Sequence, residues 1–252
     1  MEHCVAPWSG SGRTDMSKVA IVAALEREVR PLVKDWRADD KRYDSRRYRF
    51  FVNGEFVLVC GGIGAEAARR AAEAVIALYE PAIVYSAGFA GALDPSLKVG
   101  EVLRPGRIVN AGDGSSEILG GADGVLVTFG SVASPAQKKS LRESFGARAV
   151  DMESAAVARA AEARGIAFEA VKVISDASDF KLPSMEQFVD PKGRFSEWRF
   201  AFFVAVRPWM WGRVIRLARN SSRASRALCA ALRKLNTDQI EGSRQVRPSA
   251  AI

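Results

Sequence analysis

Histidine is almost absent from this chain of 252 residues, and its one copy, His3, lies near the N-terminus. The rest of the chain therefore cannot form a serine–histidine–aspartate triad, a cysteine–histidine pair or a histidine-based zinc site. The three cysteines, Cys4, Cys60 and Cys229, are far apart and form no CxxC motif, which favours a reducing compartment over a disulfide framework. Carboxylates must carry any acid–base chemistry, and we expect the protein to need no metal ion and no organic cofactor.

Long apolar runs are also lacking. The run Phe200–Val206 covers seven residues, whereas a membrane-spanning helix needs about 20. Residues 1–15 are mostly small and polar, so we expect a disordered leader and not a signal peptide. Residues 237–252 are polar with alternating charge, which predicts a disordered tail. With 48% hydrophobic residues, the chain can bury one substantial core, and we expect one domain over residues 16–236 in the cytoplasm.

Positive charge is concentrated at the C-terminal end. Residues 192–252 hold 13 of the 37 basic residues and 3 of the 29 acidic ones, so all of the net charge of +8 lies there. We expect a helical region over residues 195–236, which is rich in aromatic residues and then in arginines: Phe195, Trp198, Phe200, Phe202, Phe203, Trp209, Trp211, Arg216, Arg219, Arg223 and Arg226.

This C-terminal region has two interpretations. An interfacial helix would place the protein at an anionic membrane surface through residues 195–226. Trp211, Val214, Ile215 and Ala218 would form the apolar stripe of such a helix. Alternatively, the region is a final core helix or a dimer face with a basic outer side. No recognition motif accompanies the charge, so we expect no nucleic-acid partner.

A repeating order of apolar strands and amphipathic helices begins at Lys18. Strands are predicted at Lys18–Ala24, Tyr48–Val52, Phe56–Cys60, Ala82–Ser86, Val102–Val109, Val125–Phe129 and Phe168–Ser175. Helices are predicted at Glu26–Trp36, Ala65–Tyr79, Pro135–Phe145 and Ser154–Arg164. This order predicts an α/β fold with a mixed central sheet flanked by helices.

A glycine-rich turn, Gly61-Gly62-Ile63-Gly64, precedes one of these helices. It is not the GxGxxG pattern of dinucleotide-binding proteins, no acidic residue follows at the required distance, and no GK[ST] motif occurs. We interpret it as a tight strand-to-helix turn whose glycines let the backbone approach a small ligand.

Two acidic segments flank one predicted helix and carry the strongest indication of chemistry. Asp151-Met152-Glu153 precedes the helix, and Ser175-Asp176 ends the strand after it. In an open α/β sheet, ligands bind outside the carboxyl ends of the strands, so both segments are expected at one crevice. Two carboxylates there can divide acid and hydrogen-bonding roles if their surroundings separate their pKa values. The alternative is that Glu153 and Asp176 cap a helix and a turn.

Four blocks of the sequence resemble one family in matching order over some 160 residues. They are AIVAALEREVRPL, GGIGAEAARRAAEAVI, SAGFAGALDPSLKVGEVL, and AVDMESAAVA with VISDASD. The chain resembles the purine nucleoside phosphorylase and nucleosidase superfamily, in particular methylthioadenosine/S-adenosylhomocysteine nucleosidases. The resemblance implies a three-layer nucleoside phosphorylase-like fold, a homodimer, and cleavage of the N-glycosidic bond of a purine nucleoside, adenine being expected, with a modified 5′ group.

The resemblance also implies roles for individual residues. Asp176 falls where the family protonates N7 of the leaving purine, and Glu28 falls where its nucleosidases activate the attacking water. Glu153 matches the glutamate that holds the ribose hydroxyls, and Met152 matches the methionine under the sugar. General acid catalysis of this kind is typically worth about 10²–10⁴-fold.

The remaining expected substrate-binding residues are Gly88, Phe89 and Ser175. Phe89 stands where hydrolytic members have a serine near the nucleophile. A non-catalytic or membrane-surface binding protein on the same fold is therefore the alternative function, with Phe89 blocking the nucleophile. The sequence assigns no residue to contact the base, although residues 131–133 lie in roughly the matching region of the family.

At other positions where the chain differs from the nucleosidases, it resembles the hopanoid-associated phosphorylase branch of the superfamily. Members of that branch are thought to remove adenine from an adenosylated triterpenoid. These are DMES in place of the commoner EMEA, and Leu182-Pro183 after the last carboxylate. That resemblance makes phosphate a candidate co-substrate. The nearest candidates to bind it are Arg27, Arg46 and Arg47, although solvated surface charge is the simpler interpretation of each.

Overall fold

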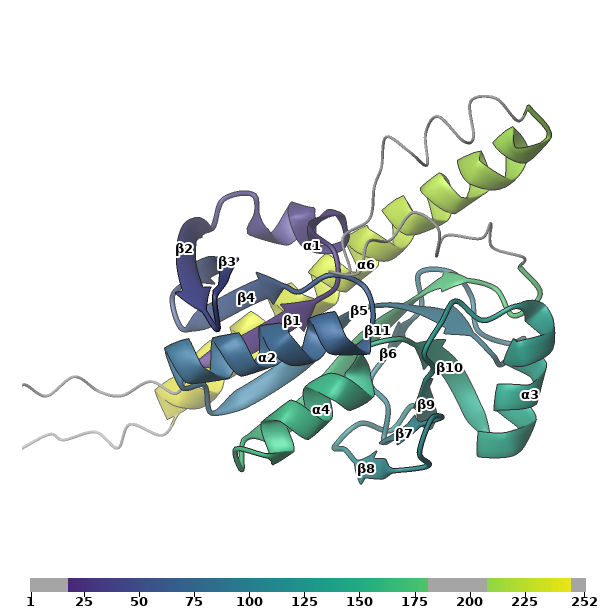
Figure 1. The fold of residues 1–252 in the computed structure, drawn as a ribbon. Helices are drawn as coiled ribbons and strands as arrows, with labels where there is room; N and C mark the ends of the chain where they lie inside the picture. The colour runs from purple at the N-terminus through teal and green to yellow at the C-terminus, as the bar shows by residue number, and fades with distance from the viewer. Residues whose placement is uncertain (1–17, 181–207, 246–252) are drawn as a thin grey trace, which may run out of the picture.

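The fold is seen in a computed structural model, which describes residues 18–180 and 208–245 (Figure 1). The described strands are β1 Val19–Ala23, β2 Arg37–Tyr43, β3 Arg46–Asn53, β4 Phe56–Cys60, β5 Ile83–Ala92, β6 Val102–Leu103, β7 Arg107–Asn110, β8 Ser116–Ile118, β9 Val125–Thr128, β10 Ala147–Asp151 and β11 Ala167–Asp176. The described helices are α1 Glu26–Val33, α2 Ala65–Tyr79, α3 Pro135–Phe145, α4 Ser154–Glu162 and α6 Pro208–Gln245.

The strands form one mixed sheet of eleven strands in the order β2-β3-β4-β1-β5-β10-β9-β7-β8, with β11 paired to β5 and β6 paired to β11. Strand β5 is the centre, because it pairs in parallel with β1 and β11 and antiparallel with β10. The predicted mixed sheet between helices is confirmed.

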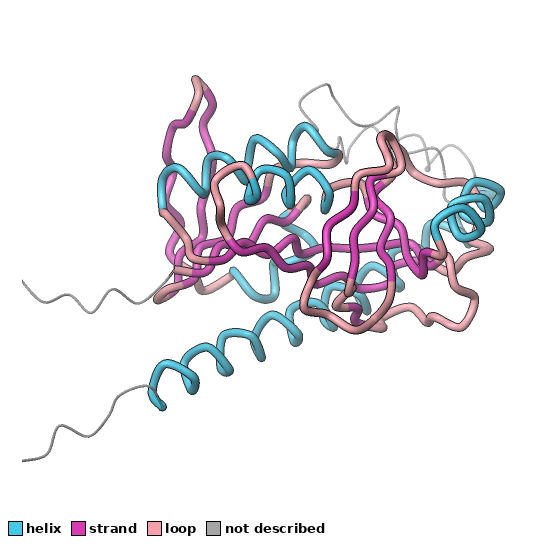
Figure 2. Tube along the Cα trace, turned by 90° about the horizontal axis from the view of Figure 1, so that it is seen from below, coloured by secondary structure: helices cyan, strands magenta, loops and turns pink. Residues whose placement is uncertain are grey.

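Buried side chains alternate between the two faces of the sheet, and helices cover each face. In β1, Ala20 and Val22 face a core that includes α2 and α4, whereas Val19, Ile21 and Ala23 face a core that includes α1 and α6. Successive side chains of a strand point to opposite faces, so both faces need apolar residues. Figures 1 and 2 show the strands between α2 and α4 on one side and the long helix α6 on the other.

Helices α2 and α4 pack closely because their contact is made of alanine and valine. The buried residues that the two helices contribute to their common core include Ala68, Ala71 and Ala72 of α2 and Val157, Ala158 and Ala161 of α4. Helix α2 also passes close to Gly61, at which a Cβ would lie 2.7 Å from the Ala71 Cβ. The glycine turn is therefore required for the packing of α2 against β4.

Helix α6 is a core helix over its middle turns. Ala224, Leu228, Cys229, Leu232 and Leu235 are buried against α1 and the sheet, while Arg216, Arg219, Arg223 and Arg226 are exposed. These residues bear out the interpretation as a final core helix with a basic outer side. Membrane contact through residues 195–226 stays a prediction, and no described helix is both long and apolar enough to cross a bilayer.

Some expected boundaries differ from the structure. Strand β2 was not predicted, because its sequence RADDKRY is polar and lies at the sheet edge with little burial. The single strand predicted at Val102–Val109 is two strands, since Pro105-Gly106 interrupts the pairing. Helix α6 reaches Gln245, past residue 237 at which the tail was expected to begin. The leader, residues 195–207 and residues 246–252 lie outside the described residues.

Packing of α6 can be tested with two substitutions on the same helix. Leu228 is completely buried and Ile215 is 52% exposed. We expect Leu228→Ala to lower the free energy of unfolding by about 2–5 kcal/mol, since it removes buried methyl groups and leaves a cavity. Ile215→Ala is the matched control and should change it by less than about 0.5 kcal/mol. Equal effects in urea unfolding would show that α6 does not pack on the sheet as described.

Candidate active site

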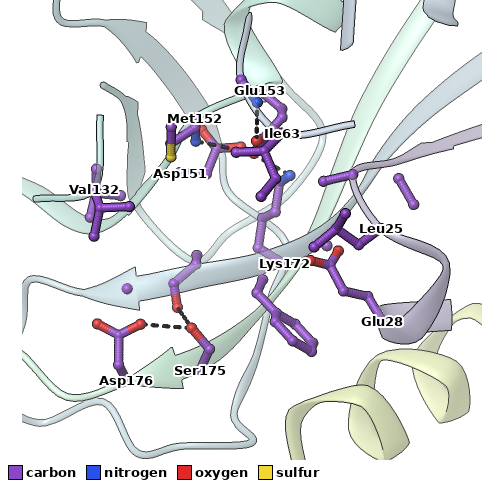
Figure 3. A pocket seen from close by; sticks show the side chains of 18 of the residues that line it. Leu25, Glu28, Ile63, Val132, Asp151, Met152, Glu153, Lys172, Ser175 and Asp176 are labelled. Carbon is purple, nitrogen blue, oxygen red and sulfur yellow. Dashed lines mark hydrogen bonds and ion pairs between the residues drawn. The ribbon is translucent and has the colours of Figure 1, made fainter. Parts of the chain in front are cut away.

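A cavity of about 840 Å³ opens beside the centre of the sheet, where β1, β5, β10 and β11 meet (Figure 3). It brings together side chains from distant segments: Glu28 of α1, Ile63 before α2, Lys138 of α3, Glu153 before α4 and Leu217 of α6. The volume is within the range of small-molecule sites. All of the site residues expected from the sequence line it: Glu28, Gly88, Phe89, Met152, Glu153, Ser175 and Asp176.

The two acidic segments converge, but not at a common carboxyl edge of parallel strands. Strand β10 runs antiparallel to β5, whereas β11 runs parallel to it. Both nevertheless meet β5 at one residue, since Val150 of β10 and Asp176 of β11 are each paired with Gly91. The predicted convergence is right, and the expected cause is wrong.

Asp176 is buried, with 3% of its surface exposed, at a bulge in β11. The register shifts between Ile174 and Asp176, so Ser175 is the extra residue, and such bulges re-aim side chains next to active sites. The Ser175 hydroxyl donates to Asp176 Oδ1 at 2.7 Å, as Figure 3 shows. Asp176 Oδ2 pairs with the ammonium of Lys138.

Glu28 has an unsatisfied carboxylate oxygen in the cavity. The residue is 6% exposed, and Oε2 has no hydrogen-bond partner among the residues that the structure describes. Burial first, and then the negative charge of Glu153, raise the pKa of Glu28 to about 8, although Lys172 acts in the opposite direction. A Cβ on Gly88 would lie 3.1 Å from Oε2, so glycine there leaves room for the carboxylate. A buried acceptor without a donor indicates a binding place for a ligand that brings one.

Met152 and Glu153 form the turn into α4. Glu153 Oε1 accepts from the Gly64 backbone amide at 2.9 Å, and Oε2 accepts from the Met152 amide at 3.2 Å. Gly64 adopts φ +93°, which favours glycine, so the glycine turn supplies an amide to Glu153. Burial first, and then the charge of Asp151, raise the pKa of Glu153 above its ordinary value. Each oxygen keeps a second lone pair for a further donor.

A buried lysine, missed in the sequence analysis, lies between these acids. Lys172 of β11 is 1% exposed, and its ammonium lies 2.9 Å from Asp151 Oδ2 and donates to Ser86 Oγ at 3.0 Å. In Figure 3 it is seen between Glu153 and Glu28. The signal was present in the sequence, because a lysine in the apolar strand AFEAVKVISD must be buried with a partner.

Phe89 and the three arginines considered for phosphate binding lie at different places in the structure. Phe89 lines the cavity and also packs against the core beside α6. Of the three arginines considered for phosphate, Arg27 lines the cavity, whereas Arg46 and Arg47 are not in its wall. Arg47 is instead paired with Asp40 of β2 at 3.2 Å, as expected for surface charge.

Residues 131–133, which the sequence left without an assigned role, are in the cavity wall. Over residues 18–180 and 208–245, no cluster of three histidine, cysteine, aspartate or glutamate side chains could hold a metal ion. The expectation of no metal and no cofactor stays a prediction.

Known proteins share this fold. A curated 5′-methylthioadenosine/S-adenosylhomocysteine nucleosidase of Marinomonas sp. is 27% identical over 215 residues, which cover 69% of this chain and 92% of the relative. The solved structure of the Helicobacter pylori nucleosidase of the same name has a TM-score of 0.64 at 16% identity, covering 88% of this chain and 99% of that one.

A futalosine hydrolase of Helicobacter pylori also has a TM-score of 0.64 at 16% identity, and it covers 88% of this chain and 98% of its own. These structural likenesses confirm the predicted nucleoside phosphorylase-like fold. The family described as the Phosphorylase superfamily matches residues 18–130 and 122–194, more than half of the sequence. The chain therefore belongs to the Phosphorylase superfamily.

Proposed function

We propose that the protein is an enzyme that hydrolyses the N-glycosidic bond of an adenine nucleoside with a modified 5′ group. The observation that carries the proposal is the meeting of Glu28, Glu153 and Asp176 around one cavity. The curated relatives named as nucleosidases favour water over phosphate as the nucleophile. A homodimer, a cytoplasmic location and membrane-surface contact belong to the same proposal as expectations from the family resemblance and the C-terminal charge.

The chemistry requires three tasks, and the cavity offers a group for each. As the bond from C1′ of the sugar to N9 of the base breaks, both electrons go to the base, and Asp176 delivers a proton to N7. Positive charge develops on the sugar, whose hydroxyls donate to Glu153. Glu28 accepts a proton from the attacking water as its oxygen bonds to C1′. The proton gained by the base and the proton lost by the water balance.

Glu28 suits the nucleophile because its Oε2 is buried without a donor. A water molecule bound there would supply that donor and be oriented by the carboxylate. Phe89 fills the position of the family's serine, so in this chain the carboxylate has less help in orienting water. The proposed mechanism therefore depends strongly on the ionised form of Glu28.

The size of the cavity supports a substituent at the 5′ carbon. Its volume of about 840 Å³ lies in the upper range of pockets for small ligands. Three residues of α6, Leu217, Ala218 and Ser221, complete the wall. We propose that α6 contributes to the choice of 5′ group.

Measuring adenine release with and without phosphate tests the proposed function. The substrates are methylthioadenosine, adenosylhomocysteine and an adenosyl-hydrocarbon. Release that does not depend on phosphate supports the nucleosidase. Strict phosphate dependence with a ribose-1-phosphate product would instead establish a phosphorylase. The relatives do not bear on the hopanoid-associated branch, so that assignment stays a prediction.

The same assay separates an enzyme from a binding protein. Asp176→Asn should reduce adenine release by about 10²–10⁴-fold, since the amide cannot deliver the proton. Nucleoside binding, measured by calorimetry, should remain in this variant. A protein that binds these nucleosides but releases no base, wild type included, would support the alternative of a non-catalytic binding protein.

Changing Glu28 tests the nucleophile's partner through the pH dependence of kcat/KM. With a pKa of about 8, Glu28 is mostly protonated at pH 6, and a base acts in its ionised form. Wild-type kcat/KM should therefore rise about tenfold per pH unit below pH 8 and level off above it. Glu28→Gln should lower kcat/KM and abolish this rise. An unchanged rise in the variant would assign it to another group.

The role of Glu153 is tested by substrate selectivity. Glu153→Gln should reduce the preference for ribosyl over 2′-deoxyribosyl substrates, because the glutamine has one acceptor oxygen instead of two. It also places an amino group against one of the backbone amides of Gly64 and Met152, so thermal unfolding must be measured alongside. Wild-type selectivity in a folded variant would exclude the ribose-holding role.

A further inference from the structure

Lys138 is a buried lysine for which the proposed reaction has so far no task. It lies in α3, one turn before the buried Leu141, and its side chain is 2% exposed. Lys139, the next residue, has a side chain that is 78% exposed. The helix thus directs one lysine into the protein and its neighbour into solvent.

The Lys138 ammonium contacts the proposed general acid directly. It forms an ion pair with Asp176 Oδ2 and donates to the Ala177 carbonyl at 2.8 Å. Two of its three hydrogens are used in these contacts, and Lys138 is also in the cavity wall. The pair connects α3 to the end of β11 at the point where the base is proposed to leave.

Strand β5 is adapted to this pair. A Cβ on Gly91 would lie 3.1 Å from Asp176 Oδ2 and 3.3 Å from Lys138 Nζ. Glycine at this position therefore gives the two charged groups their space. A connection between α3 and β11 alone would not need charge, since apolar residues of similar volume often stabilise a core as well as a buried ion pair does.

The proposed reaction needs a source for the proton that Asp176 delivers to the base. Glu28 must be ionised to accept a proton while the general acid still holds one to give. Burial raises the pKa of Glu28 to about 8. At that pH an aspartic acid in water has lost its proton, whereas a lysine ammonium keeps it. A group that stays protonated beside Asp176 would supply what the reaction needs.

We infer that Lys138 is the proton reservoir of the general acid, and this inference rests on the proposed function. One proton moves from Lys138 Nζ to the Asp176 carboxylate and from there to N7, as the electrons of the C1′–N9 bond pass to the base. Lys138 becomes a neutral amine and Asp176 returns to a carboxylate. Glu28 gains a proton from water, so the net charge of the site is unchanged. Lys138 acts through Asp176 and is a positioning residue.

Other charged groups line the same cavity as the pair. They are Arg27 and Glu28 of α1, Asp151 at the end of β10, Glu153 before α4 and Lys172 of β11. Lys172 is engaged by Asp151, which leaves Lys138 as the described lysine in direct contact with Asp176. The assignment of the reservoir to Lys138 follows from this division.

Replacing Lys138 tests the inference on two substrates that differ in their need for a proton. Lys138→Ala should lower kcat/KM for methylthioadenosine by about 10²–10⁴-fold. It should leave cleavage of a 4-nitrophenyl riboside within a few-fold, because the nitrophenolate leaves without a proton. Lys139→Ala is the matched control and should behave as wild type with both. Equal loss on both substrates in Lys138→Ala would overturn the inference in favour of a structural role.

Rescue by small cations separates a proton donor from a simple counter-ion. Ethylammonium, added to Lys138→Ala, should restore methylthioadenosine cleavage in proportion to its concentration, since it can lose a proton. Guanidinium at the same millimolar concentration has the charge but holds its protons, so it should not. Equal rescue by both cations would show that charge alone matters and would contradict the reservoir.

A second variant covers the risk that Lys138→Ala does not fold, because an unpaired buried Asp176 is costly. Lys138→Gln keeps hydrogen-bond donors for Asp176 and the Ala177 carbonyl without a transferable proton. It should lose methylthioadenosine cleavage and retain nitrophenyl riboside cleavage, and wild-type activity on both would overturn the inference. A wild-type protein inactive on every substrate would instead overturn the proposed function, and the inference with it.

Discussion

Burial of charge is the constraint on which the rest of this structure depends. The cavity holds four carboxylates, and a buried ion is tolerated when it is paired or when it becomes neutral. Asp151 and Asp176 are paired with Lys172 and Lys138. Glu28 and Glu153 instead have raised pKa values, because burial favours their neutral forms. The site thus contains two kinds of acid. Asp151 and Asp176 each have a lysine as counter-ion, whereas Glu28 and Glu153 pair with no lysine in the described part of the chain and favour the neutral form.

Strand β5 makes this arrangement possible through its glycines. Gly88 leaves room for Glu28, and Gly91 leaves room for the pair of Lys138 and Asp176. Ten residues long, β5 reaches past β1 to meet β10, so the strands that carry Asp151 and Asp176 lie on either side of it. These two glycines therefore leave the space in which charged groups from four elements meet.

The sequence predicted most of the fold and the acidic half of the site. Apolar runs identified most strands of the core, but polar β2 lacked that signal because it is an edge strand. The resemblance selected Glu28, Met152, Glu153 and Asp176, which line one cavity. The two lysines were missed, since a lysine is usually a surface residue and its burial depends on contacts far along the chain. Lys172 within an apolar strand was visible in principle, whereas Lys138 beside Lys139 was not.

Helix α6 connects the C-terminal region to the chemistry. The Ser225 hydroxyl donates to the Glu28 carbonyl at 2.9 Å, and the thiol of Cys229 also contacts that oxygen. One to two turns earlier, Leu217, Ala218 and Ser221 lie in the cavity wall. The position of α6 therefore bears on both the backbone of Glu28 and the space for the substrate. Because its outer side is basic and exposed, anything that binds this side of α6 binds a helix that already contacts the backbone of Glu28.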